Sequence, residues 1–211
     1  MTEPRLDTLR RALHEFDAGG DKTAEMLEVA AIVQEAVEPA GVRPVVVGGL
    51  ALASWVAGDV YLTADIDVVM PYSPTVDGIL EALGFSRDGR HWVLEERGIV
   101  YEAPGSTLRP DRDDYEEVRL PSGRTVLVQS PEGVLLIRME ELPGTPRADG
   151  FEQCLFLLGS GEIDDAKVTD RARELSLLPL LRWLREQADA VRAGTDLPES
   201  WEIAEKVKEL T

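Results

Sequence analysis

The sequence has little cysteine and little histidine. Its 211 residues include one cysteine, Cys154, and two histidines, His14 and His91. A single cysteine excludes an internal disulfide framework and is typical of a reducing compartment, so we predict a cytoplasmic location. The two histidines are far apart in the chain and fall on elements of different types, which argues against a zinc site built from them.

Long apolar runs and basic residues are also scarce. No stretch of about 18 apolar residues occurs, so we predict no membrane span. Lysine and arginine together number 22 against 40 aspartates and glutamates, which gives a net charge of −18 at pH 7. Because nucleic-acid binding depends on cations that neutralise phosphates, this balance argues against a general DNA- or RNA-binding protein. A halophilic origin or high solubility would give the same charge.

What the sequence does contain is a succession of segments with clear hydrophobic periodicity. Strands are expected at 43–47, 63–70, 91–95, 99–102, 115–120 and 125–129. Helices are expected at 4–17, 22–39, 49–57, 73–83, 131–141, 148–159, 164–177, 179–193 and 198–210. The first of these helices is charged and amphipathic, which distinguishes it from a signal peptide.

The order of these segments predicts an α+β protein with a mixed β-sheet. The later strands follow one another without intervening helices, so a fully parallel, doubly wound sheet is excluded. We therefore expect N-terminal helices over residues 1–41, an α/β core over 42–142 and a C-terminal helical region over 143–211. Helices should cover one side of the sheet.

Two carboxylates stand one residue apart inside the apolar strand expected at 63–70. Strand side chains alternate with period two, so Asp65 and Asp67, on either side of Ile66, project from the same face. Two like charges side by side on a half-buried strand are costly unless a cation lies between them, so the pair predicts a divalent metal site. Either residue can instead cap a turn or pair with an arginine, and such triplets occur by chance in acidic chains.

Gly48 and Gly49 close the preceding strand and open the next helix. Glycines allow a ligand to approach the backbone closely, and the first amides of a helix attract anions. This step of the chain is therefore a candidate phosphate-binding site, one strand earlier than the aspartate pair.

Together these features resemble the signature of the nucleotidyltransferase superfamily: a strand, Gly48-Gly49, a helix, and the strand that carries Asp65-Ile66-Asp67. The sequence segments VVGGLALASW and YLTADIDVV are most similar to those of small prokaryotic nucleotidyltransferase-like proteins. These include the minimal nucleotidyltransferases and the toxin components of abortive-infection-type toxin–antitoxin pairs. The likeness covers roughly residues 43–140, and its diagnostic part lies within 45–70.

The resemblance implies a nucleotidyltransferase-like core that moves an NMP from an NTP to a hydroxyl of a protein, a tRNA or a small molecule. In the family two aspartates hold Mg²⁺, and a third carboxylate on a neighbouring strand completes the metal site and activates the attacking hydroxyl. Asp65 and Asp67 match the first two, and Glu102 is the candidate for the third. Glu95 and Glu96 are rivals, but they fall at an expected hairpin tip.

The chain departs from the family pattern in the basic segment that contacts the nucleotide phosphates. The corresponding residues are Pro146-Arg147-Ala148-Asp149, with alanine where a lysine would be expected before the acid. Arg147 and Arg138 are therefore the side chains that we expect to supply this charge. Arg138 can equally pair with Glu141, three residues further along a solvated helix face.

Three functions remain open from the sequence. The first is an Mg²⁺-dependent nucleotidyltransferase, which the resemblance connects with toxin–antitoxin pairs. The second is a catalytically inactive protein of the same fold that binds a cognate protein partner through its helical tail; the missing lysine favours it and the intact acids oppose it. The third is a metal-dependent hydrolase with a chance Asp-x-Asp triplet.

Overall fold

A computed structural model of the protein describes residues 3–56, 63, 65–107, 114–144 and 148–211. These residues form two compact units. The first unit contains the described residues up to Ser54 and from Thr63 to Gln129. The second contains Trp55, Val56 and the described residues from Ser130 to Thr211. The division into three regions expected from the sequence stays a prediction.

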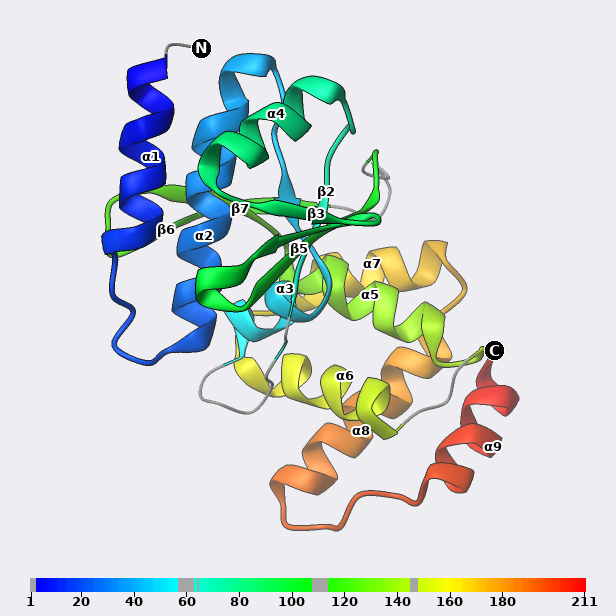
Figure 1. The fold of residues 1–211 in the computed structure, drawn as a ribbon. Helices are drawn as coiled ribbons and strands as arrows, with labels where there is room; N and C mark the ends of the chain where they lie inside the picture. The colour runs from blue at the N-terminus through cyan, green and yellow to red at the C-terminus, as the bar shows by residue number, and fades with distance from the viewer. Residues whose placement is uncertain (1–2, 57–62, 64, 108–113, 145–147) are drawn as a thin grey trace. The chain divides into compact units, whose positions relative to one another are not determined.

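A mixed sheet is the centre of the first unit (Figure 1). Its seven strands in the described residues are arranged in the order β3-β4-β5-β2-β1-β7-β6. The pairs β1–β7 and β2–β5 are parallel, and the other neighbours are antiparallel. The strands are β1 (Val45–Val46), β2 (Asp65–Val69), β3 (Ser86–Asp88), β4 (His91–Leu94), β5 (Ile99–Gly105), β6 (Tyr115–Arg119) and β7 (Thr125–Gln129). The predicted α+β class with a mixed sheet is confirmed.

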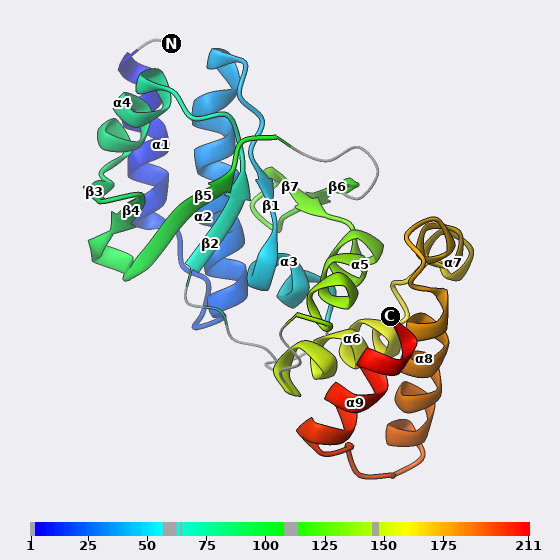
Figure 2. The same cartoon turned by 90° about the vertical axis from the view of Figure 1, so that its right-hand side faces the viewer.

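Three helices form a layer on one face of this sheet, as Figures 1 and 2 show: α1 (Glu3–Glu15), α2 (Lys22–Val37) and α4 (Pro74–Leu83). Helix α2 is buried along most of its length, which explains why its sequence is apolar on nearly every side. Ser73 caps α4 by accepting a hydrogen bond from the amide of Val76, and a proline follows at the first helical position. These three helices share one face of the sheet, as predicted, whereas the helix that begins at Gly48 is not part of this layer.

The second unit is helical. It contains α5 (Pro131–Glu141), α6 (Ala148–Ser160), α7 (Asp165–Glu174), α8 (Leu178–Arg192) and α9 (Ser200–Leu210). Helix α6 contacts α5, α8 and α9 (Figure 2). Its Phe151 ring lies 5.2 Å from that of Trp183 on α8. Cys154 is fully buried in the same helix, and this burial raises the pKa of its thiol to about 12. Among the described residues, no helix has the length and apolar character needed to cross a membrane.

The sequence did not predict strand β3. Its three residues, Ser86-Arg87-Asp88, are all exposed, so they carry no apolar alternation that a sequence reading could detect. The strand forms because Asp88 pairs with His91 across a two-residue turn, Gly89-Arg90, which folds it back against β4. Strand β5 also extends beyond the expected end at Glu102 to Gly105.

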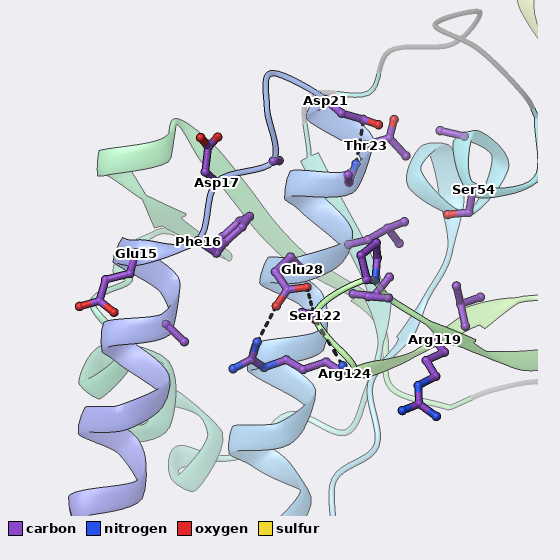
Figure 3. Close-up of a pocket in the computed structure, with 18 residues that line it drawn as sticks. Glu15, Phe16, Asp17, Asp21, Thr23, Glu28, Ser54, Arg119, Ser122 and Arg124 are labelled. Carbon is purple, nitrogen blue, oxygen red and sulfur yellow. Dashed lines mark hydrogen bonds and ion pairs between the residues drawn. The ribbon is translucent and has the colours of Figure 1, made fainter.

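A buried ion pair joins α2 to the turn between β6 and β7. Glu28 on α2 is 6% exposed, and its carboxylate accepts hydrogen bonds from Ser122 Oγ and Arg124 Nη1, each at 2.7 Å (Figure 3). Arg124 Nε also lies 3.3 Å from Glu35 Oε2. Glu28, Ser122 and Arg124 line an open pocket of about 750 Å³ between α1, α2, α3 (Gly48–Trp55) and the β6–β7 turn.

Replacing Glu28 by alanine is expected to lower the free energy of unfolding by about 2–4 kcal/mol. The substitution leaves a partly buried guanidinium with only its weaker carboxylate partner and deprives the Ser122 hydroxyl of its acceptor. Urea unfolding followed by circular dichroism measures the loss. Glu35→Ala is the matched control, because Glu35 is 40% exposed and its removal should cost less than about 1 kcal/mol. Equal losses of unfolding free energy for the two variants would contradict the conclusion that Glu28 is the main carboxylate partner of Arg124.

Candidate metal centre

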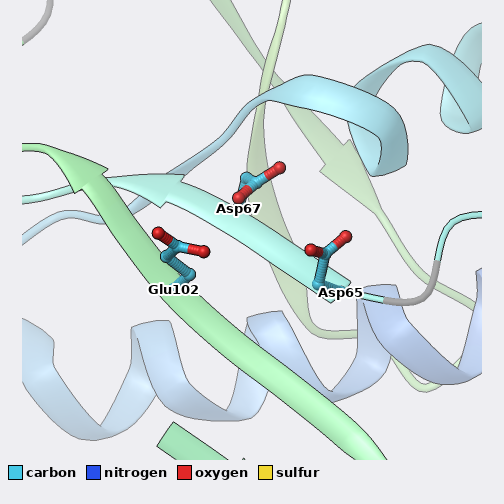
Figure 4. Close-up of side chains that lie close together, drawn as sticks. All are labelled: Asp65, Asp67 and Glu102. Atoms are coloured by element: carbon cyan, nitrogen blue, oxygen red, sulfur yellow. The ribbon is translucent and has the colours of Figure 1, made fainter. Parts of the chain in front are cut away.

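Strand β2 presents two carboxylates on one face and apolar side chains on the other. Ile66 and Val68 are fully buried, whereas Asp65, Asp67 and Val69 are only partly buried. The apolar face lies against the helical layer, so the alternation of the strand places both carboxylates on the opposite face (Figure 4). The fold thus creates the close pair of like charges that the sequence indicated.

Glu102 reaches the same face from the neighbouring strand. Strands β2 and β5 are parallel, and their register places Glu102 directly beside Asp67. Glu102 is 8% exposed. Figure 4 shows the side chains of Asp65, Asp67 and Glu102 converging above the sheet, and one oxygen from each lies within 4.8 Å of the others. The structure therefore brings together the three carboxylates that sequence reasoning selected.

The chemistry of this donor set fits a hard divalent cation. Carboxylate oxygens are preferred ligands of Mg²⁺, and two ligands on opposite sides of that ion are about 4.2 Å apart. One oxygen of each carboxylate lies within 4.8 Å of the other two, so all three are within reach of a common ion. Asp65 is held in place by Thr63, whose hydroxyl donates to Asp65 Oδ1 at 3.0 Å. Asp65, Asp67 and Glu102 can therefore close on a metal with small movements of their side chains.

Gly48 lies against the carboxylate of Asp67. Its φ of 65° is in the left-handed region, and a Cβ built at this position would lie 2.6 Å from Asp67 Oδ2. The amide of Val47 donates to the carbonyl of Asp67 at 2.9 Å, which fixes the two strands together at this point. Gly48 and Gly49 begin α3, so the first amides of an eight-residue helix lie beside the carboxylates. Only glycine allows this close approach.

Two further side chains contact Glu102, and sequence reasoning missed both. Arg90 Nε lies 3.1 Å from Glu102 Oε1, and His91 Nδ1 lies 3.1 Å from Glu102 Oε2. His91 is the direct neighbour of Glu102 in the antiparallel β4–β5 pair. The expected strands 91–95 and 99–102, paired outward from their ends, would place residue 92 opposite residue 102. The observed register, which pairs Leu94 with Ile99, places His91 there instead.

The rival carboxylates do not belong to this cluster. Glu95 and Glu96 lie in the 3₁₀ helix η2 (Glu95–Arg97), which connects β4 to β5. Glu95 accepts a hydrogen bond from Ser86, and Glu96 contacts His14. Their place at the end of the hairpin explains why Glu102 alone joins the aspartates.

The structure places only one of the two arginines that the sequence assigned to the nucleotide phosphates. Arg138 lies on α5 in the second unit, where its Nη1 donates to Glu141 Oε2 at 2.7 Å, the pairing that was the alternative from the sequence. Arg147 lies outside the described residues. Contact of Arg138 or Arg147 with a nucleotide stays a prediction.

Comparison with known proteins supports the fold. No family model matches the chain, and no curated protein matches it. A solved structure that is similar to this chain is that of an antigenic nucleotidyltransferase-like protein from Paracoccidioides brasiliensis. It is 13% identical, with a TM-score of 0.54, and the match covers 79% of this chain and 93% of that chain.

Two structures of ANT(2'')-Ia are also similar. The solution structure of this antibiotic-resistance factor is 14% identical, with a TM-score of 0.45 and coverage of 77% of this chain and 90% of that chain. The crystal structure in complex with adenylyl-2''-tobramycin is 16% identical, with a TM-score of 0.48 and coverage of 68% and 93%. The fold of this chain is nucleotidyltransferase-like, as the sequence predicted.

Proposed function

We propose that the protein is a Mg²⁺-dependent nucleotidyltransferase that moves an NMP from an NTP to a hydroxyl acceptor. The observation that carries this proposal is the convergence of Asp65, Asp67 and Glu102 beside a Gly-Gly helix start, in a nucleotidyltransferase-like fold. Neither a helix N-terminus nor an acidic pair would suffice alone. The close approach of Gly48 to Asp67 supports a phosphate site at the helix start next to a cation site at the carboxylates.

In the proposed reaction Asp65 and Asp67 hold the metal, and Glu102 completes its ligand set. The metal, when bound, polarises phosphoryl oxygens and lowers the pKa of an attacking hydroxyl. Amides of Gly48 and Gly49 donate to the departing phosphates. Glu102 accepts the hydroxyl proton while the acceptor oxygen bonds to the α-phosphorus. The bond from that phosphorus to its bridging oxygen breaks, and pyrophosphate leaves with the electron pair.

The acceptor is a protein side chain, a tRNA end or a small molecule. The net charge of −18 disfavours tRNA, because its backbone would be repelled outside a local cationic region. We further propose that the protein acts in the cytoplasm as one component of a toxin–antitoxin pair. Its helical region, residues 143–211, would then be the part that binds the cognate protein partner.

Calorimetric titration with each NTP, with and without Mg²⁺, tests the proposal. We expect binding that requires Mg²⁺ and that disappears in the double variant Asp65→Asn/Asp67→Asn. Intact-mass measurement after incubation with protein and small-molecule acceptors should then show the mass of one added NMP. Absence of binding by the wild type, or equal binding by the double variant, would overturn the proposal. Release of free NMP without any adduct would point to a hydrolase.

A catalytically inactive protein of the same fold is the second candidate. The observation that favours it is the pairing of Glu102 with Arg90 and His91, because a third carboxylate with protein partners is also expected in a site that no longer takes a metal. Nucleotide binding that is independent of Mg²⁺, together with no adduct for any acceptor, would identify this candidate.

A further inference from the structure

Arg90 is an exposed cation that contacts the least exposed part of the candidate site. Its side chain is 77% exposed, whereas that of its partner Glu102 is 10% exposed. Within the part of the chain that the structure describes, the guanidinium contacts Glu102 and His91 Nε2, the latter at 3.4 Å, in both cases through Nε. The two Nη groups carry the other four N–H donors, and the high exposure of the side chain leaves them accessible from solvent.

The backbone fixes where this cation stands. Arg90 occupies the two-residue turn between β3 and β4, directly before His91, and His91 pairs with Glu102. Neighbouring positions on β4, β5 and β2 are thus His91, Glu102 and Asp67, in that order across the sheet. Gly48 lies on the far side of Asp67. The carboxylates are therefore flanked by helix amides on one side and by a guanidinium on the other.

We infer that Arg90 binds a phosphate group of the substrate at the Glu102 side of the site. This inference rests on the proposed function and deepens it. If Glu102 binds a metal ion, the ion neutralises part of the negative charge of the carboxylate. The electrostatic attraction between Glu102 and Arg90 then becomes weaker. The planar guanidinium can then turn its Nη donors to two oxygens of one phosphate, a geometry that lysine cannot reproduce.

Arg90 would supply positive charge of the kind that the sequence pattern predicts at Arg138 and Arg147. Two sources of the bound phosphate are compatible with its position: the α-phosphate of the NTP, or a phosphate carried by the acceptor next to its hydroxyl. The simpler alternative is a surface ion pair in which Arg90 only neutralises Glu102. Exposed pairs of that kind contribute little, and their removal would strengthen rather than weaken the binding of a cation at Glu102.

Calorimetry on the full chain distinguishes these possibilities. The first probe is a non-hydrolysable α,β-methylene NTP with Mg²⁺. The second is glycerol 3-phosphate, compared with glycerol, titrated into protein that is saturated with the first probe. The variants are Arg90→Ala and Arg90→Lys. The control is Arg43→Ala, which also removes one exposed positive charge but belongs to a surface pair with Glu117.

If the phosphate belongs to the nucleotide, Arg90→Ala should weaken binding of the NTP analogue about 10- to 100-fold. Arg90→Lys should restore only part of this loss, and Arg43→Ala should bind like the wild type. If the phosphate belongs to the acceptor, the analogue should bind unchanged, and glycerol 3-phosphate should lose its advantage over glycerol in Arg90→Ala.

Wild-type affinities of Arg90→Ala for both probes would overturn the inference and leave the proposed function intact. Stronger binding of Mg²⁺ alone, with no change for either probe, would identify Arg90 as a counter-ion of Glu102 and also overturn it. A wild-type protein that binds neither probe would overturn the inference and the proposed function together.

Discussion

Asp67→Asn is expected to reduce nucleotidyl transfer by about a thousandfold or more while leaving the protein folded. The amide has nearly the shape of the carboxylate, but it lacks the negative charge that a divalent ion requires. Metal coordination is worth several kcal/mol in the transition state, and about 4 kcal/mol corresponds to a thousandfold change in rate. Adduct formation followed by mass spectrometry at saturating NTP and Mg²⁺ measures the effect.

The same substitution should not lower stability in the absence of divalent metal. Asp65, Asp67 and Glu102 bring like charges within 4.8 Å of one another, so removal of one charge relieves repulsion. The melting temperature of Asp67→Asn in EDTA should therefore equal or exceed that of the wild type. Asp88→Asn, which removes an exposed acid from β3, is the control and should change neither transfer nor melting. A transfer rate of Asp67→Asn close to that of the wild type would rule out a metal-ligating role.

The pair Asp65 and Asp67 could be found from sequence because its signal is local. A carboxylate, an isoleucine and a second carboxylate in an apolar run carry their own periodicity, and the strand only has to form for both acids to share a face. Glu102 required one further step, the expectation that its strand lies next to that of the aspartates. The family resemblance supplied that step, and the β2–β5 register agrees with it.

Arg90 could not be found in the same way. Strand β3 is three exposed residues long and has no apolar pattern, and its existence depends on pairing with β4 rather than on its own propensity. Similarly, the parallel pairing of β1 with β7 joins segments about eighty residues apart, and no local pattern encodes it. Local periodicity therefore predicted most elements and two of the acids, whereas the partners of Glu102 depend on the exact register between neighbouring strands.

Gly48 is the position where a small substitution is expected to have the second large effect. In Gly48→Ala the new methyl group would meet Asp67 Oδ2 at 2.6 Å, and the residue would have to keep a φ of 65°. The left-handed conformation alone costs alanine about 1–2 kcal/mol, and displacement of Asp67 adds to this. We expect a loss of about 2–3 kcal/mol in unfolding free energy and a loss of transfer of at least about a hundredfold.

Gly78→Ala, in the same unit, is expected to have the opposite effect on the free energy of unfolding. Gly78 lies within α4, and a Cβ at this position would meet nothing within 4 Å, so alanine should stabilise the helix by about 0.5–1 kcal/mol. Activity should not change. If Gly48→Ala behaved like Gly78→Ala in both measurements, the close approach of Gly48 to Asp67 would matter neither for stability nor for transfer.

A double-mutant cycle separates the two costs at Gly48. In an Asp67→Ala background the carboxylate that would collide with the new methyl group is gone, so Gly48→Ala should retain only the conformational cost of about 1–2 kcal/mol. The difference between its effects in the two backgrounds then measures the contact between Gly48 and Asp67. A coupling near zero would mean that the glycine is required only for its backbone conformation. A coupling of about 1 kcal/mol or more would mean that the helix start and the proposed metal ligand Asp67 depend on each other.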